Sequence, residues 1–245
     1  MEYTFITNMR IKKISNNEAF DTEDQLAIEE PLEIQLQYGA PDSRINRSIS
    51  VTMRTPGHDV EVATGFLFTE GIIRSNREIL FIEQDDDDKN RIIIGLQDAA
   101  NPDIQKLDRN FYTTSSCGVC GKSSIDAIKT ISEYKSQPDN ICIKAELLYP
   151  LHNIVRERQA IFDTTGGLHA SALFDLKGNF LMLREDVGRH NALDKLIGAA
   201  LLNDQLPMSN NILLLSGRAS FELIQKASMA GIKVITAVGA PSSLA

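Results

Sequence analysis

The chain has 245 residues, of which 42% are hydrophobic and 24% charged, and its formal net charge is -8 at pH 7. This is an ordinary globular composition, and the length allows one large domain or two smaller ones. The acidic balance and the lack of a long basic run argue against nucleic-acid binding as the main activity. No apolar run approaches the roughly 18 residues of a membrane span, and the N-terminus has no secretory signal. We therefore expect a cytoplasmic protein that does not act at a membrane.

The first part of the chain, residues 1–110, predicts a small α+β domain. Strand character marks residues 31–37 and 45–55, and turn residues lie between them. Apolar residues at helical spacing then predict a helix that ends near Gly71. Two further strands are expected at 78–83 and 91–96, joined by an acidic, solvated turn.

The second part, residues 111–245, predicts a layered α/β domain. After a cysteine-containing loop we expect a helix over 122–134, followed by a β-hairpin over 170–186. The clearest helix of the chain covers 190–202, where apolar residues form a single stripe. Residues 211–243 predict strand, loop, helix, strand and loop. Both of these strands are continuous apolar runs, as expected of parallel strands covered on both faces.

Two of the three cysteines, Cys117 and Cys120, form a C-x-x-C pair between glycines. A structural zinc site usually has four ligands, but here only Cys142 and four scattered histidines could complete one. Three cysteines are too few and too odd in number for a disulfide framework. Lys122 and the helix expected after the pair favour the thiolate, so the pattern favours thiol chemistry such as persulfide transfer. A metal clip and two thiols without special function remain alternatives.

Two loops rich in glycine and serine follow the last two expected strands. The first, "SGRAS", opens a helix, and backbone N–H groups at a helix start can hold a phosphate together with arginine and hydroxyl groups. The second is "VGAPSS". If their strands are parallel neighbours, both loops lie at the sheet edge where open α/β sheets bind ligands. For each loop alone, helix capping is the alternative. The predicted ligand residues are Ser216, Gly217, Arg218, Ser220, Gly239, Ser242 and Ser243.

Three further segments carry polar groups suited to a site. The loop "REDVGRHN" before the clearest helix supplies Arg189 and His190, although Asp186 or Asn191 could simply cap that helix. His169 follows a Gly-Gly pair, where a core histidine and a catalytic one are equally compatible with the sequence. The segment "MRTPGHD" predicts a turn into a helix, with its arginine or histidine as further site candidates.

Taken together, these segments resemble the formate dehydrogenase accessory sulfurtransferase family (FdhD). The matching stretches are, in order, "EEPLEI", "TMRTPGHDVEVATGFLFTEGII", "SSCGVCGK", "TGGLHASALFD", "REDVGRHNALDKLIG", "LLLSGRASFELIQKA" and "AVGAPSSLA". The resemblance covers most of the chain, from Glu29 to the end. It implies a homodimer whose subunit has a small α+β N-terminal domain and a three-layer αβα domain of the cytidine-deaminase-like type.

The resemblance also implies a function. A cysteine desulfurase would supply sulfur as a persulfide on Cys117, with Cys120 as its partner. The sulfur would pass to the molybdenum cofactor, in its bis-molybdopterin guanine dinucleotide form, before that cofactor enters formate dehydrogenase. No structural metal is implied. The pyrophosphates of the cofactor fit the predicted anion loops together with Arg189, His190 and His169. Members of the family continue past the "PSSLA" stretch with a basic tail that contributes to cofactor binding, and this sequence ends at Ala245 without it.

Three other functions remain as alternatives. A zinc deaminase would need H-x-E followed by P-C-x-x-C, but here the C-x-x-C precedes His169 and Ser171 takes the place of the glutamate. A thiol–disulfide oxidoreductase would place its C-x-x-C in a thioredoxin-like strand–helix context, which the glycine-rich loop lacks. A non-catalytic chaperone of the molybdenum cofactor would need the same ligand loops but no thiol chemistry.

Overall fold

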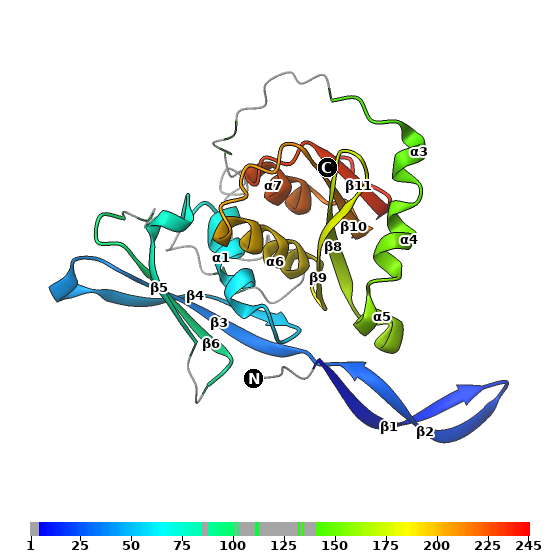
Figure 1. The fold of residues 1–245 in the computed structure, drawn as a ribbon. Helices are drawn as coiled ribbons and strands as arrows, with labels where there is room; N and C mark the ends of the chain where they lie inside the picture. Colours follow the sequence, from blue (N-terminus) through cyan, green and yellow to red (C-terminus); the bar gives the residue numbers. More distant parts are fainter. Residues whose placement is uncertain are drawn as a thin grey trace.

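A computed structural model describes residues 5–84, 88–100, 102, 111–112, 132, 134 and 141–245. Its strands form a two-stranded, a five-stranded and a four-stranded sheet, with helices between and outside them (Figure 1). The described strands are β1 Ile6–Ser15, β2 Glu18–Ala27, β3 Glu30–Tyr38, β4 Ile45–Arg54, β5 Ile79–Gln84, β6 Arg91–Leu96, β7 Phe111–Tyr112, β8 His169–Asp175, β9 Phe180–Asp186, β10 Asn211–Arg218 and β11 Val234–Gly239. The described helices are α1 Asp59–Thr69, α3 Ala145–Leu148, α4 Leu151–Arg156, α5 Ala160–Thr165, α6 Arg189–Leu202 and α7 Phe221–Met229, with 3-10 turns at Pro41–Ser43 and Asn76–Glu78.

The five-stranded sheet has the order β5-β6-β3-β4-β7. Strand β3 runs antiparallel to β4 and parallel to β6. Its alternate residues Leu32, Ile34 and Leu36 are fully buried, because successive side chains of a strand point to opposite faces. The predicted strands and helix of the first part are all present, and α1 ends two residues before Gly71.

The four-stranded sheet has the order β11-β10-β8-β9. Strands β10 and β11 are parallel, as their apolar runs predicted, whereas β8 is antiparallel to both β10 and β9. On one face, Ile212 and Leu214 pack with Leu151 and Val155 of α4. The opposite face is covered by α6 and α7, whose contributions to the buried cluster include Leu193, Leu196, Ile197, Leu223 and Ala227. This is the expected αβα layering, and the α/β prediction is confirmed.

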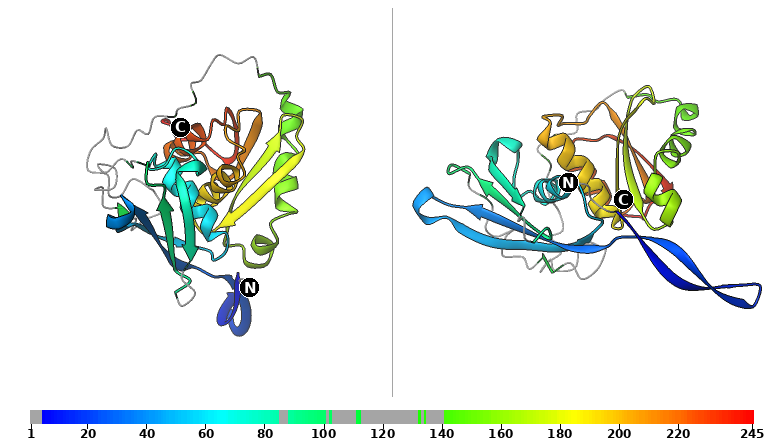
Figure 2. Two further views of the ribbon diagram at one scale, coloured as in Figure 1. Left: turned by 60° about the vertical axis from the view of Figure 1, so that its left-hand side comes forward. Right: turned by 60° about the horizontal axis from the view of Figure 1, so that its bottom comes forward.

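Helices α1 and α6 lie between the two larger sheets and touch backbone to backbone (Figure 2). A Cβ atom added to Gly65 would lie 1.9 Å from the carbonyl oxygen of Asp194, and one added to Gly198 would lie 1.9 Å from that of Glu61. Only glycine at both positions permits such an approach. A single buried apolar cluster therefore extends from the five-stranded sheet through these helices to the four-stranded sheet. The division into domains at residue 110 stays a prediction.

The hairpin of β1 and β2 projects from the rest of the molecule (Figures 1 and 2). Most of its residues are exposed. Its turn residues Asn16 and Asn17 both have positive φ, 52° and 67°, which asparagine tolerates better than most residues. Neither this hairpin nor the short helices α3, α4 and α5 were predicted from the sequence.

Candidate functional site

The four-stranded sheet brings most of the predicted ligand residues to one edge. Strands β9, β10 and β11 end at this edge, and β8 begins there because it is antiparallel to its neighbours. His169 at the start of β8 is the register partner of Asp186 at the end of β9. Arg218 at the end of β10 is the register partner of Gly239 at the end of β11. These four residues, from four different strands, thus lie together at the edge where α6 and α7 begin.

The "SGRAS" loop is packed against the start of β8. The Ser216 hydroxyl accepts a hydrogen bond of 2.8 Å from the Ala170 N–H, so this serine joins β10 to β8 and does not cap α7. A Cβ atom on Gly217 would lie 3.4 Å from Nδ1 of His169, so the imidazole packs against the Gly217 backbone. Ser220 occupies the N-cap position of α7 without a capping side-chain bond. Its buried Oγ has no hydrogen-bond partner among the described residues.

The "VGAPSS" loop lies beside the "SGRAS" loop, as parallel strands predicted. A Cβ atom on Gly239 would lie 2.8 Å from Cγ of Arg218 and 3.1 Å from its Cα, so glycine permits this close approach. The Ser242 N–H donates a 3.0 Å hydrogen bond to the carbonyl oxygen of Ala219. Ser242 and Ser243 are themselves exposed. The two loops therefore form one surface at the sheet edge.

The start of α6 adds positive charge and a histidine to this edge. Arg189 is half-buried, and its buried Nε finds no hydrogen-bond partner within the described ranges. His190, the next residue, is 8% exposed. Partial burial and the nearby Arg189 guanidinium lower the pKa of His169, and the Asp186 carboxylate opposes this shift. A neutral imidazole offers one donor and one acceptor to a ligand.

This arrangement can bind an anion. The buried Arg189 Nε and Ser220 Oγ are donors that the described residues leave unused, and buried polar groups normally have partners. Both lie where helices start, and helix N-termini favour negative charge. The edge therefore suits phosphate or pyrophosphate groups.

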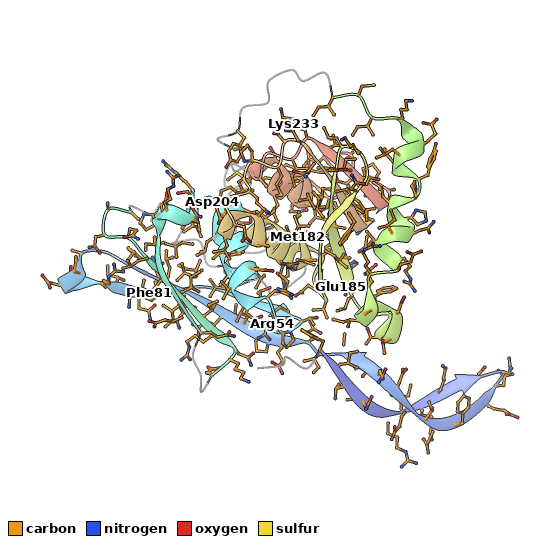
Figure 3. The ribbon with its side chains drawn as sticks, in the orientation of Figure 1. Arg54, Phe81, Met182, Glu185, Asp204 and Lys233 are labelled. Carbon is orange, nitrogen blue, oxygen red and sulfur yellow. The ribbon has the colours of Figure 1, made fainter. Side chains whose placement is uncertain are left out.

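The two candidates from the segment "MRTPGHD", Arg54 and His58, do not belong to these loops. Arg54 is 1% exposed and forms a pair of hydrogen bonds to Asp59, at 3.0 and 3.1 Å, so it lies in the interior at the end of β4 (Figure 3). His58 is half-exposed in a left-handed conformation before α1, with Nδ1 3.1 Å from Glu61 Oε2. Glu61 also accepts a 2.7 Å hydrogen bond from Arg184. Burial alone would raise the pKa of Glu61, but the bonds from Arg184 and His58 lower it to about 2.

Ser171 was not predicted as a site candidate from the sequence. This serine is 1% exposed on β8, two residues after His169, and its Oγ has no partner in the part of the chain that the structure describes. The available signal was a hydroxyl inside the otherwise apolar run "ASALF". Its register partner is Leu215, directly before the "SGRAS" loop.

The thiol predictions fall mostly outside the described residues. Cys117 and Cys120 belong to this undescribed part, whereas Cys142 is a free, exposed cysteine. No group of three or more His, Cys, Asp and Glu side chains suited to a metal ion occurs within the described ranges. Among the described residues, no helix is both long and apolar enough to cross a membrane.

The chain is thus an α/β protein with glycine-containing loops and buried donors at one sheet edge, the place where open α/β sheets bind ligands. The chain belongs to the FdhD/NarQ family, whose model matches residues 27–245. It is 46% identical over 243 residues to the sulfur carrier protein FdhD of Mycolicibacterium paratuberculosis, which covers 96% of this chain and 86% of the relative. It is 48% identical over 231 residues to the sulfur carrier protein FdhD of Streptomyces coelicolor, covering 91% and 79%.

The fold is also that of a solved structure. A crystal structure assigned as a formate dehydrogenase accessory protein from Desulfotalea psychrophila superposes with a TM-score of 0.73. The match covers 98% of this chain and 87% of the other, at 23% identity. At this identity, the similarity establishes the fold.

Proposed function

We propose that this protein is a sulfur carrier for formate dehydrogenase. It receives persulfide sulfur from a cysteine desulfurase on its C-x-x-C pair and passes it to the molybdenum cofactor, bis-molybdopterin guanine dinucleotide, before insertion into the enzyme. The observation that carries this proposal is the family match over residues 27–245, together with relatives above 40% identity that are named sulfur carrier proteins.

The sheet edge supports the ligand part of the proposal. A guanine dinucleotide carries pyrophosphate groups, and a protein with a net charge of -8 needs local donors to hold them. Arg189 Nε and Ser220 Oγ are such donors, and both are buried. Gly217 and Gly239 let His169 and Arg218 lie close against the backbone of the two loops, at the same edge as these donors.

The thiol part of the proposal assigns Cys117 as the carrier and Cys120 as its partner. The Cys117 thiolate attacks the outer sulfur of the desulfurase persulfide, a new S–S bond forms, and the desulfurase cysteine leaves as a thiolate. We propose that this exchange takes place in the cytoplasm and in a homodimer, the latter as the family resemblance implies.

Mass spectrometry tests the carrier role. After incubation with desulfurase and cysteine, the intact protein should gain the mass of one sulfur atom, and a reductant should remove it. The gain should disappear in Cys117→Ala but persist in the matched control Cys142→Ala, which removes an exposed cysteine outside the pair. If Cys117→Ala still yields formate dehydrogenase with a fully sulfurated cofactor, the carrier role is wrong and a cofactor chaperone takes its place.

Calorimetry tests the ligand role with guanosine diphosphate as the probe. The protein should bind it, and Arg189→Gln should weaken binding about tenfold, because a charge-assisted hydrogen bond is lost. Arg158→Gln is the control, since Arg158 stacks on Phe180 outside this edge. Equal affinity of Arg189→Gln and Arg158→Gln for guanosine diphosphate would contradict a nucleotide site at this sheet edge.

A further inference from the structure

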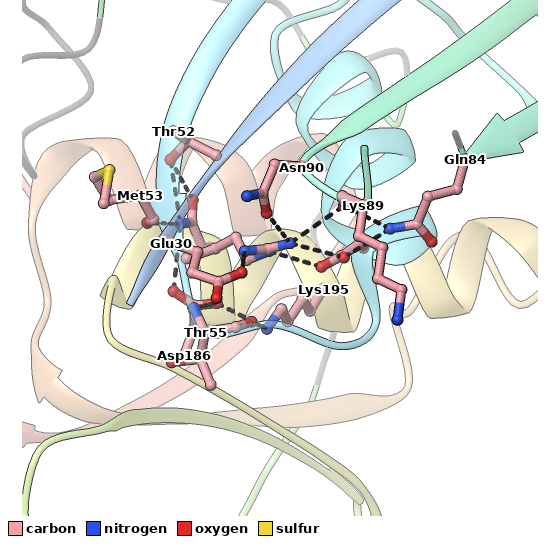
Figure 4. A network of polar contacts seen from close by, with 12 residues as sticks. Glu30, Thr52, Met53, Thr55, Gln84, Lys89, Asn90, Asp186 and Lys195 are labelled. Carbon is pink, nitrogen blue, oxygen red and sulfur yellow. Dashed lines mark hydrogen bonds and ion pairs between the residues drawn. The ribbon is translucent and has the colours of Figure 1, made fainter. Parts of the chain in front are cut away.

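A buried ion pair ties the predicted site to the other large sheet (Figure 4). Lys195 of α6 and Asp186 at the end of β9 are each almost fully buried, with Nζ 2.7 Å from Oδ2. Thr55, which follows β4, joins both partners. Its N–H donates to Asp186 Oδ2 at 3.1 Å, and its carbonyl oxygen accepts from Lys195 Nζ at 2.8 Å.

The same contacts fix the short loop before α6. The Val187 N–H donates to the Thr55 hydroxyl at 3.2 Å, and the Gly188 N–H donates to Asp186 Oδ1 at 2.8 Å. Asn191, inside the first turn of α6, donates from Nδ2 to the carbonyl oxygen of Met53 at 2.8 Å. Val187 and Gly188, the two residues between Asp186 and Arg189, are therefore both held through their backbone N–H groups.

We propose that Thr55, Asp186 and Lys195 form a clamp that positions Arg189 and His169 for anion binding. This inference rests on the ligand part of the proposed function. Arg189 follows the two clamped loop residues directly, so the clamp fixes the backbone from which its side chain extends. His169 lies beside Asp186 across the β8–β9 pair. The end of a strand in the five-stranded sheet thus supports a site at the edge of the four-stranded sheet.

The clamp differs from an ordinary buried ion pair in where its hydrogen bonds go. A buried pair alone is weak evidence for a role, because well-packed apolar residues often replace one at little cost. Here four of the bonds end on backbone atoms of Thr55, Val187 and Gly188, and the last two residues directly precede Arg189. Burial raises the pKa of Asp186, and the Lys195 ammonium and the Gly188 N–H oppose that rise.

The test compares two buried threonine hydroxyls in the full-length protein. Thr55→Val keeps the shape of the side chain and both backbone bonds but removes the acceptor for the Val187 N–H. Thr69→Val is the matched control, because the Thr69 hydroxyl is equally buried and bonds Asp194 at 2.9 Å in a second Asp–Lys pair. Thr55→Ser retains the hydroxyl and should restore wild-type behaviour.

Two readouts are measured, the affinity for guanosine diphosphate and the NMR titration of His169. Thr55→Val should weaken binding about threefold to tenfold, as expected for one lost hydrogen bond, and should shift the His169 titration. Thr69→Val should lower Tm without changing either readout. The groups facing His169 are Asp186 of β9 and Arg189 of α6, both governed by the clamp.

The outcomes separate the two proposals. If the wild type binds the nucleotide and Thr55→Val alters neither affinity nor the His169 titration, the clamp is wrong while the ligand site stands. If the wild type does not bind the nucleotide, the ligand part of the proposed function fails. The His169 titration then still decides whether Thr55 controls the geometry of this edge.

Discussion

Helix α6 carries two buried Asp–Lys pairs that use the same chemistry in different surroundings. Asp194 receives hydrogen bonds from Lys226 of α7 and Thr69 of α1, all within packed helices. Its neighbour Lys195 points to another side of α6, since successive residues are about 100° apart, and bonds Asp186 at the end of β9. The first pair joins helix to helix. The second joins α6 to the end of β9 and, through Thr55, to the chain that follows β4, so the second pair is the one that adjoins the predicted site.

The largest effects should come from removing either buried lysine. Lys226→Met should lower the free energy of unfolding by about 3–5 kcal/mol, because the Asp194 carboxylate loses its buried partner. Lys195→Met should lower the free energy of unfolding by about as much, because the Asp186 carboxylate then loses its buried partner. Urea unfolding measures both, and calorimetry on the folded fraction should show weaker nucleotide binding in Lys195→Met alone.

Burial alone would lower the pKa of Lys226, but Asp194 and Glu70 raise it above its ordinary value, so this lysine is charged in the folded protein. Replacing both partners, as in Asp194→Leu with Lys226→Met, should therefore recover most of the lost stability. Equal loss of nucleotide affinity in Lys226→Met and Lys195→Met would break the distinction between the two pairs.

A somewhat smaller effect is expected at the helix crossing beside Asp194. Gly198→Ala would place Cβ 1.9 Å from the Glu61 carbonyl oxygen, and relieving that overlap should cost about 3 kcal/mol. Gly167→Ala is the control, because its added Cβ would meet nothing nearer than 3.8 Å. A shift in Tm for Gly167→Ala as large as that for Gly198→Ala would show that the crossing is not tightly packed.

The smallest effect should come from Glu61, whose ion pair with Arg184 is partly exposed. Glu61→Gln should cost about 1 kcal/mol at neutral pH, since solvent screens this pair. The folded-state pKa of about 2 lies below the ordinary 4.5, so the contribution is present above 4.5 and is lost as the pH falls toward 2. Unfolding curves for wild type and variant should converge over that interval. A pH-independent difference would instead indicate a packing effect.

Regular elements could be predicted because their apolar periods are strong, as in β3 and α6. The β1–β2 hairpin could not, because its strands pair charged residues such as Arg10 with Glu23 and build no core. The missed signal was the Asn16–Asn17 dipeptide, which favours a tight hairpin turn. Helices α3, α4 and α5 are only four to six residues long, too short for a period to emerge.

The position of the site was predictable, but its internal bonds were not. Parallel strands β10 and β11 placed the two loops at one edge. The actual partner of Ser216 is the Ala170 N–H, 46 positions away, and Thr55 lies 131 positions from Asp186. Such contacts depend on how whole layers pack, which a local pattern does not contain. Asp186 therefore suggested a helix cap in the sequence, whereas in the structure Gly188 is the N-cap residue of α6 and Asp186 accepts bonds from Lys195 and Thr55.

The glycine contact between α1 and α6 also limits how the two large sheets can move. Sliding one helix along the other would drive a flanking side chain into the facing backbone, because no space exists beside Gly65 and Gly198. Rotation about the contact would separate the apolar cluster that spans both sheets and the bonds from Thr55 to Asp186 and Lys195. The two large sheets should therefore behave as one rigid body.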